Sequence, residues 1–180
     1  MSRSELIVPR SSLDLERPIA DLDEIRQHNP QRHEMEQLSA ILFEDLDTMR
    51  CAALKRITDD EFWCRGHMPG MPLMPGVMML ECVAQLASYF SQKHDLLGAE
   101  IVGFGGVDEV RFRGIVTPGD DLVLMVKLLK ARRGRMVVAE FQGVVGQTMV
   151  VEGILRGIPI PVAAVHEELA KRGRLPDNVG

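Results

Sequence analysis

Several features that mark whole classes of protein are scarce or missing in this chain of 180 residues. The three cysteines, Cys51, Cys64 and Cys82, have neither CxxC nor metal-ligand spacing, so we expect free buried thiols rather than a disulfide framework or a metal site. No run of about 18 apolar residues occurs, so no transmembrane helix is expected. The N-terminus lacks an apolar stretch of signal-peptide length, and we therefore expect a cytoplasmic protein.

Positive charge and aromatic side chains are also in short supply. The net charge of −5 gives nucleic-acid binding no overall electrostatic support. Aromatic residues contribute only 4% of the chain, whereas methionine occurs 11 times. Apolar and charged residues, at 46% and 26%, occur in proportions typical of a globular protein, and the length suits one domain with one core.

Residues 65–93 combine a proline-rich loop with an apolar helix. Prolines recur at every third position of the loop, at Pro69, Pro72 and Pro75. Proline restricts both itself and the preceding residue to non-helical conformations, so residues 67–74 are predicted to be extended and stiff. Residues 77–90 contain no glycine or proline and are almost all apolar or small, which predicts a buried helix beginning near Pro75.

Two ionisable side chains in this stretch are candidates for acid–base chemistry. Glu81 is the only charged residue over residues 77–91, and a buried carboxylate needs either a partner or a function. It acts as an acid if its surroundings are apolar, or it is simply solvated if it reaches the helix edge. His67 can exchange protons near neutral pH, but its distance from Glu81 in sequence requires folding or oligomerisation to unite them.

The stretch GHMPGMPLMPGVMMLECVAQ resembles the active-site signature of the 3-hydroxyacyl-[acyl-carrier-protein] dehydratases of bacterial fatty acid synthesis, in the FabZ-type form that carries Glu on the helix. The matching motifs are His-x-Pro-Gly, Pro-x-x-Pro-Gly-Val and Glu-x-x-Ala-Gln. A second similar segment, VDEVRFRGIVTPGDDLVL, covers residues 107–124, and the whole similarity covers roughly residues 20–158. A match of this length to a family signature indicates membership.

One residue and one segment depart from the family pattern. Met68 stands where the family usually has Phe. Residues 30–41 are polar, whereas family members have a segment of the form Pro-His-Arg-Tyr-Pro-Phe-Leu-Leu there. This segment forms one wall of the substrate site in the family, so the sequence predicts a differently built wall.

The resemblance implies an α+β hot-dog fold, in which a curved antiparallel sheet wraps a long central apolar helix. Alternation in residues 121–131 supports strands in the second half, since Leu122, Leu124, Val126 and Leu128 share one face. We expect a short helix over residues 21–27. Strands are expected over residues 41–47, 49–57, 61–64, 101–104, 109–115, 121–131, 135–143 and 148–158. Residues 1–20 are predicted to form an extended arm, residues 21–160 a single domain, and residues 161–180 a surface helix or tail.

The reaction implied by the resemblance removes water from a (3R)-3-hydroxyacyl thioester and gives a trans-2-enoyl thioester without a metal or cofactor. His67 is assigned as the base for the C2 proton, and Glu81 as the group that protonates the leaving hydroxyl. The backbone N–H of Gly76 or Val77 would bind the thioester oxygen at the helix start. Gln85 lies one turn after Glu81 and could orient its carboxyl group, or could be a polar edge residue.

Further residues are assigned to the substrate and its carrier. Met68 and Pro69 are predicted to contact the substrate, and the central methionines are interpreted as core filling or as an adaptable wall for an acyl chain. Basic residues that could dock an acidic acyl carrier protein, or could simply be solvated, are Arg111, Arg113, Lys130, Arg132 and Arg133.

The family implies an active site shared between the two subunits of a homodimer, with a hexamer as a larger assembly. Two other functional classes compete with the dehydratase interpretation. One is a different hot-dog thioester enzyme, either an acyl-CoA hydratase or a thioesterase. The other is a non-catalytic acyl-binding subunit, which the polar segment over residues 30–41 favours.

Overall fold

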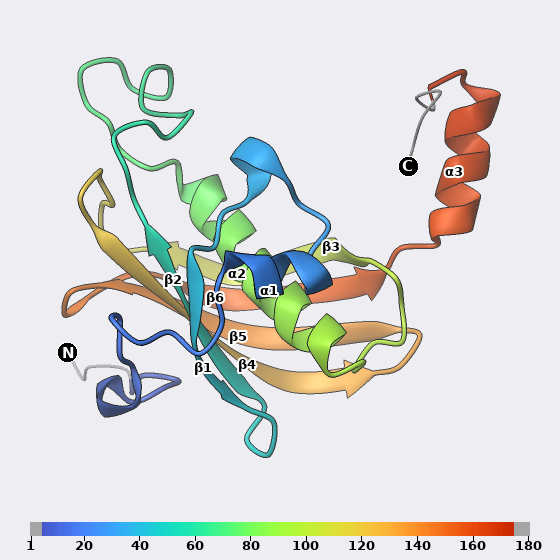
Figure 1. Ribbon diagram of the computed structural model, residues 1–180, viewed down its shortest axis with the longest axis horizontal. Helices are drawn as coiled ribbons and strands as arrows, with labels where there is room; N and C mark the ends of the chain where they lie inside the picture. The colour runs from blue at the N-terminus through green and yellow to red at the C-terminus, as the bar shows by residue number, and fades with distance from the viewer. Residues whose placement is uncertain (1–4, 175–180) are drawn as a thin grey trace.

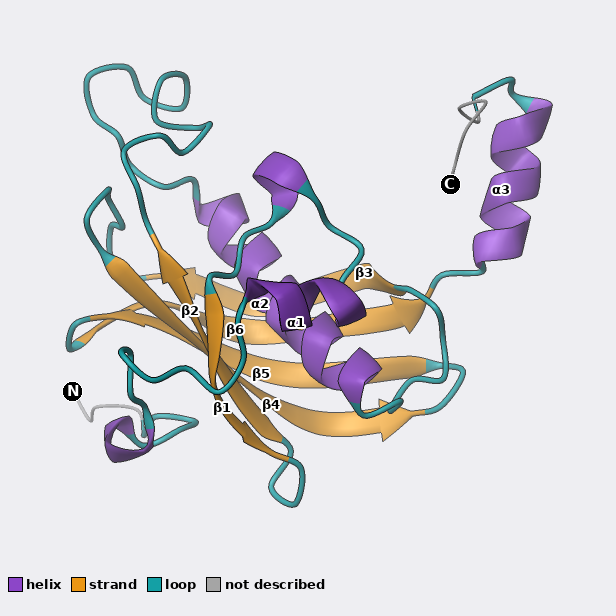
Figure 2. Ribbon diagram, in the orientation of Figure 1, coloured by secondary structure: helices purple, strands orange, loops and turns teal. Residues whose placement is uncertain are grey.

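A curved antiparallel sheet wraps around one long helix in the computed structural model, which describes residues 5–174 (Figures 1 and 2). The sheet has six strands in the order β1-β2-β4-β5-β6-β3, and every neighbouring pair is antiparallel. The strands are β1 (Ala40–Asp45), β2 (Arg50–Arg56), β3 (Val102–Phe112), β4 (Asp121–Arg132), β5 (Met136–Val145) and β6 (Thr148–Pro159). This arrangement confirms the predicted fold class.

The central helix, α2 (Gly76–Lys93), lies across the concave face of the sheet. Its side chains Val83, Leu86 and Phe90 are fully buried and pack in one core cluster with Leu122 and Leu124 of β4. Pro75 occupies the N-cap position in an extended conformation, so the helix begins one residue after it. Burial of these apolar side chains is the main favourable term that holds α2 on the sheet.

The N-terminal arm covers part of the opposite face of the sheet. Ile7 and Val8 are buried against Val123 and Met125 of β4 in a second apolar cluster. The backbone N–H of Ile7 donates to Oε1 of Gln142 on β5 at 2.9 Å. Both faces of β4 are therefore buried, because the helix covers one face and the arm covers the other.

Three smaller helical elements and one terminal helix complete the fold. Helix α1 (Leu22–His28) is capped by Asp21, whose side chain accepts from the N–H of Glu24. Two 3₁₀ turns cover Arg10–Ser12 and His33–Met35. Helix α3 (Val162–Lys171) projects from the end of β6 and buries none of its residues (Figure 1). Among residues 5–174, no helix combines the length and hydrophobicity needed to span a bilayer.

Three local predictions were wrong. Residues 61–64 form turns rather than a strand, because Trp63 folds inward and its carbonyl accepts from the N–H groups of Gly66 and His67. The strands expected over residues 101–104 and 109–115 are one strand, β3, whose two register shifts absorb the irregular residues between them. The loop over residues 67–74 is not extended throughout, since the N–H of Met71 donates to the carbonyl of Met68 at 2.9 Å and Gly70 has a φ of 80°.

Candidate active site

The proline loop stands out from the body of the molecule but is anchored at its base (Figure 1). Lys55 of β2 forms an ion pair with Glu61 at 2.6 Å, and both side chains are almost completely buried. Trp63, only 3% exposed, packs into the core just beyond this pair. At the other end of the loop the N–H of Met74 donates to the carbonyl of Val116 at 2.8 Å. The loop is thus exposed at its tip and held at both ends.

His67 lies on the exposed part of this loop, and one of its ring nitrogens is occupied. Nδ1 of His67 lies 2.9 Å from the carbonyl oxygen of Leu73. A carbonyl oxygen can only accept, so Nδ1 carries the hydrogen and Nε2 of the neutral ring keeps its lone pair. In the neutral ring this contact leaves the lone pair on Nε2, which is the tautomer required of a general base.

Glu81 lies on α2, is partly buried, and is oriented by its neighbour one turn along. Nε2 of Gln85 donates to Oε1 of Glu81 at 2.7 Å. Gln85 itself is only 2% exposed, so it is a buried residue and not a polar edge residue. This contact is the i,i+4 pair that the helical spacing predicts.

The polar segment over residues 29–37 explains why Gln85 is buried. Nε2 of Gln85 also donates to the carbonyl of Met35 at 2.7 Å, and its Oε1 accepts from the N–H of Gln37 at 3.0 Å. Asn29 donates through Nδ2 to the backbone carbonyl of Gln85 at 2.9 Å. The sequence analysis did not identify Asn29, Met35 and Gln37 as partners of Gln85. The available signal was the unusual polarity of a segment that the family pattern makes apolar.

The start of α2 provides backbone donors without partners. Within residues 5–174 the N–H groups of Gly76 and Val77 have no hydrogen-bond acceptor, and no side chain caps the helix. Val77 is 68% exposed. Gly76 faces the ring of Phe112, which a Cβ would meet at 2.8 Å. Free N–H groups at a helix N-terminus favour a negatively charged oxygen.

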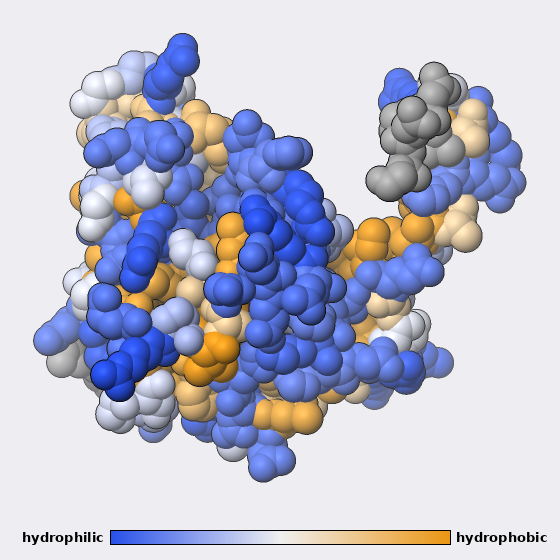
Figure 3. All heavy atoms as spheres, viewed as in Figure 1, coloured by the Kyte–Doolittle hydropathy of each residue, from blue (hydrophilic) through white to orange (hydrophobic). Residues whose placement is uncertain are grey.

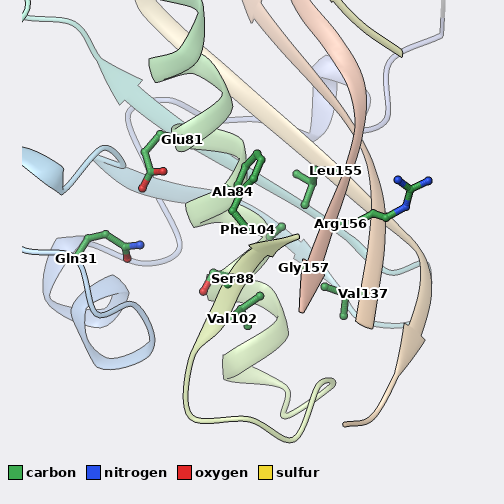
Figure 4. A pocket seen from close by; sticks show the side chains of 12 residues that line it. Gln31, Glu81, Ala84, Ser88, Val102, Phe104, Val137, Leu155, Arg156 and Gly157 are labelled. Atoms are coloured by element: carbon green, nitrogen blue, oxygen red, sulfur yellow. The ribbon is translucent and has the colours of Figure 1, made fainter. Parts of the chain in front are cut away.

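A pocket of about 70 Å³ lies between α2 and the strands β3, β5 and β6 (Figure 4). Its wall includes Glu81 and Ala84 from α2, Phe104 from β3, and Leu155 from β6. Neither His67 nor the other predicted substrate contacts from the loop and the helix start contribute to its wall. The single chain therefore unites Glu81 with Gln85 and a pocket, and places His67 on a separate projecting loop.

The basic residues predicted for carrier docking lie toward opposite ends of the strands. Arg111 pairs in register with Glu152 near the start of β6, whereas Arg132 pairs with Met136 at the β4–β5 hairpin. The start of β5 lies beside the end of β6, so the two positions are separated along the strand direction. Arg113 forms an ion pair with Glu152, and Arg133 forms one with Asp95.

The cysteines are unsuited to nucleophilic catalysis. Burial raises the pKa of the Cys82 thiol to about 12 and the pKa of Cys51 well above its usual value. Burial also raises the pKa of Cys64. The thiolate is the reactive form, so the raised pKa values disfavour nucleophilic reactivity, although Cys64 is only partly buried and not fully buried as predicted.

Comparisons with known proteins relate the chain to one enzyme family. A family model described as a FabA-like domain matches residues 29–154. The 3-hydroxyacyl-[acyl-carrier-protein] dehydratase FabZ of Streptococcus pneumoniae (strain CGSP14) is 34% identical over 135 residues, which cover 75% of this chain and 94% of that protein. The enzyme of the same name from Haemophilus influenzae is 43% identical over 93 residues, 51% of this chain and 61% of that protein.

A solved structure shares the fold at low sequence identity. The dehydratase heterocomplex ApeI:P from Xenorhabdus doucetiae superposes with a TM-score of 0.68 at 16% identity, covering 81% of this chain and 96% of that chain.

Proposed function

We propose that this chain, which belongs to the FabA-like family and has its hot-dog fold, dehydrates (3R)-3-hydroxyacyl-[acyl-carrier-protein] to trans-2-enoyl-[acyl-carrier-protein] in fatty acid biosynthesis. It is a hydro-lyase whose relatives over three quarters of the chain carry that activity in their names. The observation that supports this most directly is the pairing of Glu81 with Gln85 beside a pocket of mixed polarity, in a chain whose His67 is held through Nδ1 by the carbonyl of Leu73.

The chemistry needs one base and one acid. Nε2 of His67 takes the C2 proton, and the electron pair of that C–H bond forms the C2–C3 double bond. The C3–O bond breaks as Glu81 donates its proton to the departing hydroxyl, which leaves as water. The products are the enoyl thioester, imidazolium and carboxylate, and proton exchange between these groups and solvent restores both residues.

The start of α2 would stabilise the negative charge that develops during the reaction. Negative charge develops on the thioester oxygen while the C2 proton leaves. The free N–H groups of Gly76 and Val77 are oriented to bind that oxygen, and one such donor contributes about 3–4 kcal/mol. Met68 and Pro69 lie on the loop that carries His67 and would border the thioester.

We further propose that the complete site forms between two copies of the chain. Within residues 5–174, β3 pairs with β6 alone, so its other edge is open. The apolar side chains Phe104 and Phe112 on this edge strand are 50% and 51% exposed. At its base the proline loop contacts the segment that follows β3, where the N–H of Met74 donates to the carbonyl of Val116. An open, apolar edge strand suits pairing with a second copy about a two-fold axis.

Hydrophobic surface near this edge supports the same proposal. Figure 3 shows hydrophobic atoms gathered where the chain leaves the sheet for α3. Ile158 of β6 is 39% exposed there, and a Cβ on Gly105 of β3 would meet its side chain at 2.8 Å. Contiguous exposed apolar surface of this kind indicates a protein interface. Association of such dimers into a hexamer is a further proposal.

Carrier docking is proposed for those predicted docking residues that have no ion pair among the described residues. These are Arg111 on β3, and Lys130 and Arg132 at the β4–β5 hairpin. Charge reversal at each end separately, with Arg111→Glu or with Lys130→Glu/Arg132→Glu, identifies the end that docks the carrier. Substitution at the docking end should raise KM for the carrier-bound substrate and leave turnover of a pantetheine thioester unchanged. We propose the cytoplasm as the compartment, where such carriers and the three free thiols would coexist.

The decisive experiment measures enoyl formation from 3-hydroxyacyl-[acyl-carrier-protein]. His67→Ala and Glu81→Gln should each lower kcat by roughly 100-fold or more while the fold is kept. Matched controls are His166→Ala and Glu16→Gln, whose side chains are exposed and distant from the pocket. Release of free acid and thiol would indicate a thioesterase, and binding without turnover would indicate a non-catalytic subunit; either result overturns the proposal.

A further inference from the structure

The pocket beside Glu81 contains two uncharged polar side chains that the dehydration chemistry leaves unused, while its cation, Arg156, forms an ion pair with Asp108. Phe104 and Leu155 give its wall an apolar character, whereas Gln31 contributes an amide and Ser88 a hydroxyl group (Figure 4). A pocket that only receives an alkyl chain gains nothing from polar side chains, because each loses its water on binding. The two groups therefore need an explanation of their own.

Gln31 is the more informative of the two. Its side-chain carbonyl oxygen is buried and has no hydrogen-bond donor anywhere in residues 5–174. Its amide end points into the pocket in Figure 4. The backbone is held in place, since Nη1 of Arg32 donates to the carbonyl of Gln31 at 2.6 Å and to that of Asn29 at 2.8 Å. A buried, unpaired amide oxygen on a residue whose backbone is anchored at a pocket wall suits a ligand that brings a hydrogen-bond donor.

Ser88 lies deeper along the same wall. It follows Glu81 by seven positions, so it lies on the same helix face, about 10 Å further along the axis. Ala84 separates the two on that face, and its small side chain leaves room between α2 and the sheet. Ser88 is only 5% exposed, so its hydroxyl faces the pocket wall and not bulk solvent. Since the proposed role of Glu81 places C3 beside its carboxyl group, Ser88 lies about two helical turns beyond the reacting carbons.

We propose that Gln31 and Ser88 make the site selective for a 3-hydroxyacyl chain that carries a second oxygen, a hydroxyl or a carbonyl, beyond C3. This inference rests on the proposed dehydratase function and specifies its substrate class. The amide of Gln31 supplies both a donor and an acceptor, and Ser88 supplies a hydroxyl, so either oxygen type is matched. A plain alkyl chain would leave these groups desolvated and unpaired, which discriminates against it.

The test compares three thioesters on the same carrier: 3-hydroxybutyryl, 3-hydroxyoctanoyl and 3,5-dihydroxyoctanoyl. The wild-type protein should turn over the dihydroxy substrate with a kcat/KM at least about tenfold above that of the octanoyl analogue. Gln31→Leu, which keeps the size and removes the polar atoms, should abolish most of this preference, and Ser88→Ala should reduce it. Gln27→Leu on the exposed face of α1 is the matched control and should change nothing.

The outcomes separate this inference from the proposed function. Equal turnover of the octanoyl and dihydroxyoctanoyl substrates, or a preference that survives Gln31→Leu, overturns the polar-chain inference and leaves the dehydratase proposal standing. Absence of enoyl product from all three substrates overturns the dehydratase proposal itself. Retained thermal unfolding temperatures in the variants exclude misfolding, and replacing an unpaired buried amide with Leu should not destabilise the protein.

Discussion

At the scale of single residues, Gln85 connects the candidate acid to the polar wall of the site. It bonds through its side chain to Glu81, Met35 and Gln37, and its backbone carbonyl accepts from Asn29. These contacts hold one rotamer of a buried amide, so the carboxyl group of Glu81 keeps one orientation toward the pocket. A reacting group held in one geometry reacts faster than a mobile one.

Replacing Gln85 should therefore damage both stability and catalysis. Gln85→Leu leaves the buried N–H of Gln37 without a partner and removes the donor to the carbonyl of Met35, which should cost about 1–3 kcal/mol of unfolding free energy in urea titrations. The value of kcat should fall more than KM rises, because Glu81 is no longer oriented. Unchanged kcat in the folded variant would show that Glu81 needs no positioning. Gln27→Leu provides the control for the substitution itself.

At the scale of elements, the loop that carries His67 depends on the buried pair of Lys55 and Glu61. Removing one partner leaves an unpaired buried charge, so Glu61→Leu should destabilise the fold by about 3–5 kcal/mol. The double variant Lys55→Met/Glu61→Leu should recover most of that loss, since no charge remains buried. Urea unfolding of the single and double variants measures both effects. A double variant as unstable as the single one contradicts this account.

The C-terminal end of α2 is joined to α1 and β1 by a second charged cluster. Nζ of Lys93 bonds to Glu24 at 2.6 Å and to Glu44 at 3.0 Å, and the hydroxyl of Tyr89 donates to Glu44 at 2.6 Å. The hydrogen bond from Lys93 lowers the pKa of Glu24 and outweighs burial, which raises it.

This cluster predicts an acid-sensitive contribution to stability. A carboxyl group whose pKa is lower in the folded state stabilises the fold above its unfolded pKa of 4.5 and loses that contribution as the pH falls through the folded value. The urea midpoint of the wild type should therefore fall from about pH 5 to about pH 3 more steeply than that of Glu24→Gln. Parallel curves for the two proteins would show that Glu24 makes no such contribution.

At the scale of the whole molecule, the proposed active site needs two chains. His67 bonds to its own loop and Glu81 to its own helix, and among the described residues β3 leaves one edge of the sheet open. A dimer that places the loop of one copy against α2 of the other would complete the acid–base pair.

Subunit complementation tests this arrangement directly. Co-expressed His67→Ala and Glu81→Gln chains should regain about one quarter of the wild-type activity, because about half of the dimers are mixed and each mixed dimer holds one intact site. Each variant alone should stay inactive. No recovery in mixed dimers isolated with two affinity tags would place both residues of a site on the same chain.

The sequence by itself determined the features that depend on neighbouring residues. The absence of glycine and proline after Gly76 predicted α2, and the alternation of Leu122 and Leu124 predicted β4, because helix and strand periods are local properties. The signature around His67 and Glu81 identified the family, which the comparisons confirmed. The boundaries of the arm, the domain and the tail stay predictions.

Only the tertiary structure decided what depends on residues distant in the chain. Gln85 meets Gln37 across 48 positions, and the turn at Trp63 and the continuity of β3 follow from packing and from pairing with β6. The separation of Arg111 from Arg132 follows from the register of the strands. No local pattern encodes these contacts, because they arise only when the sheet closes around α2 and each buried polar group finds a partner.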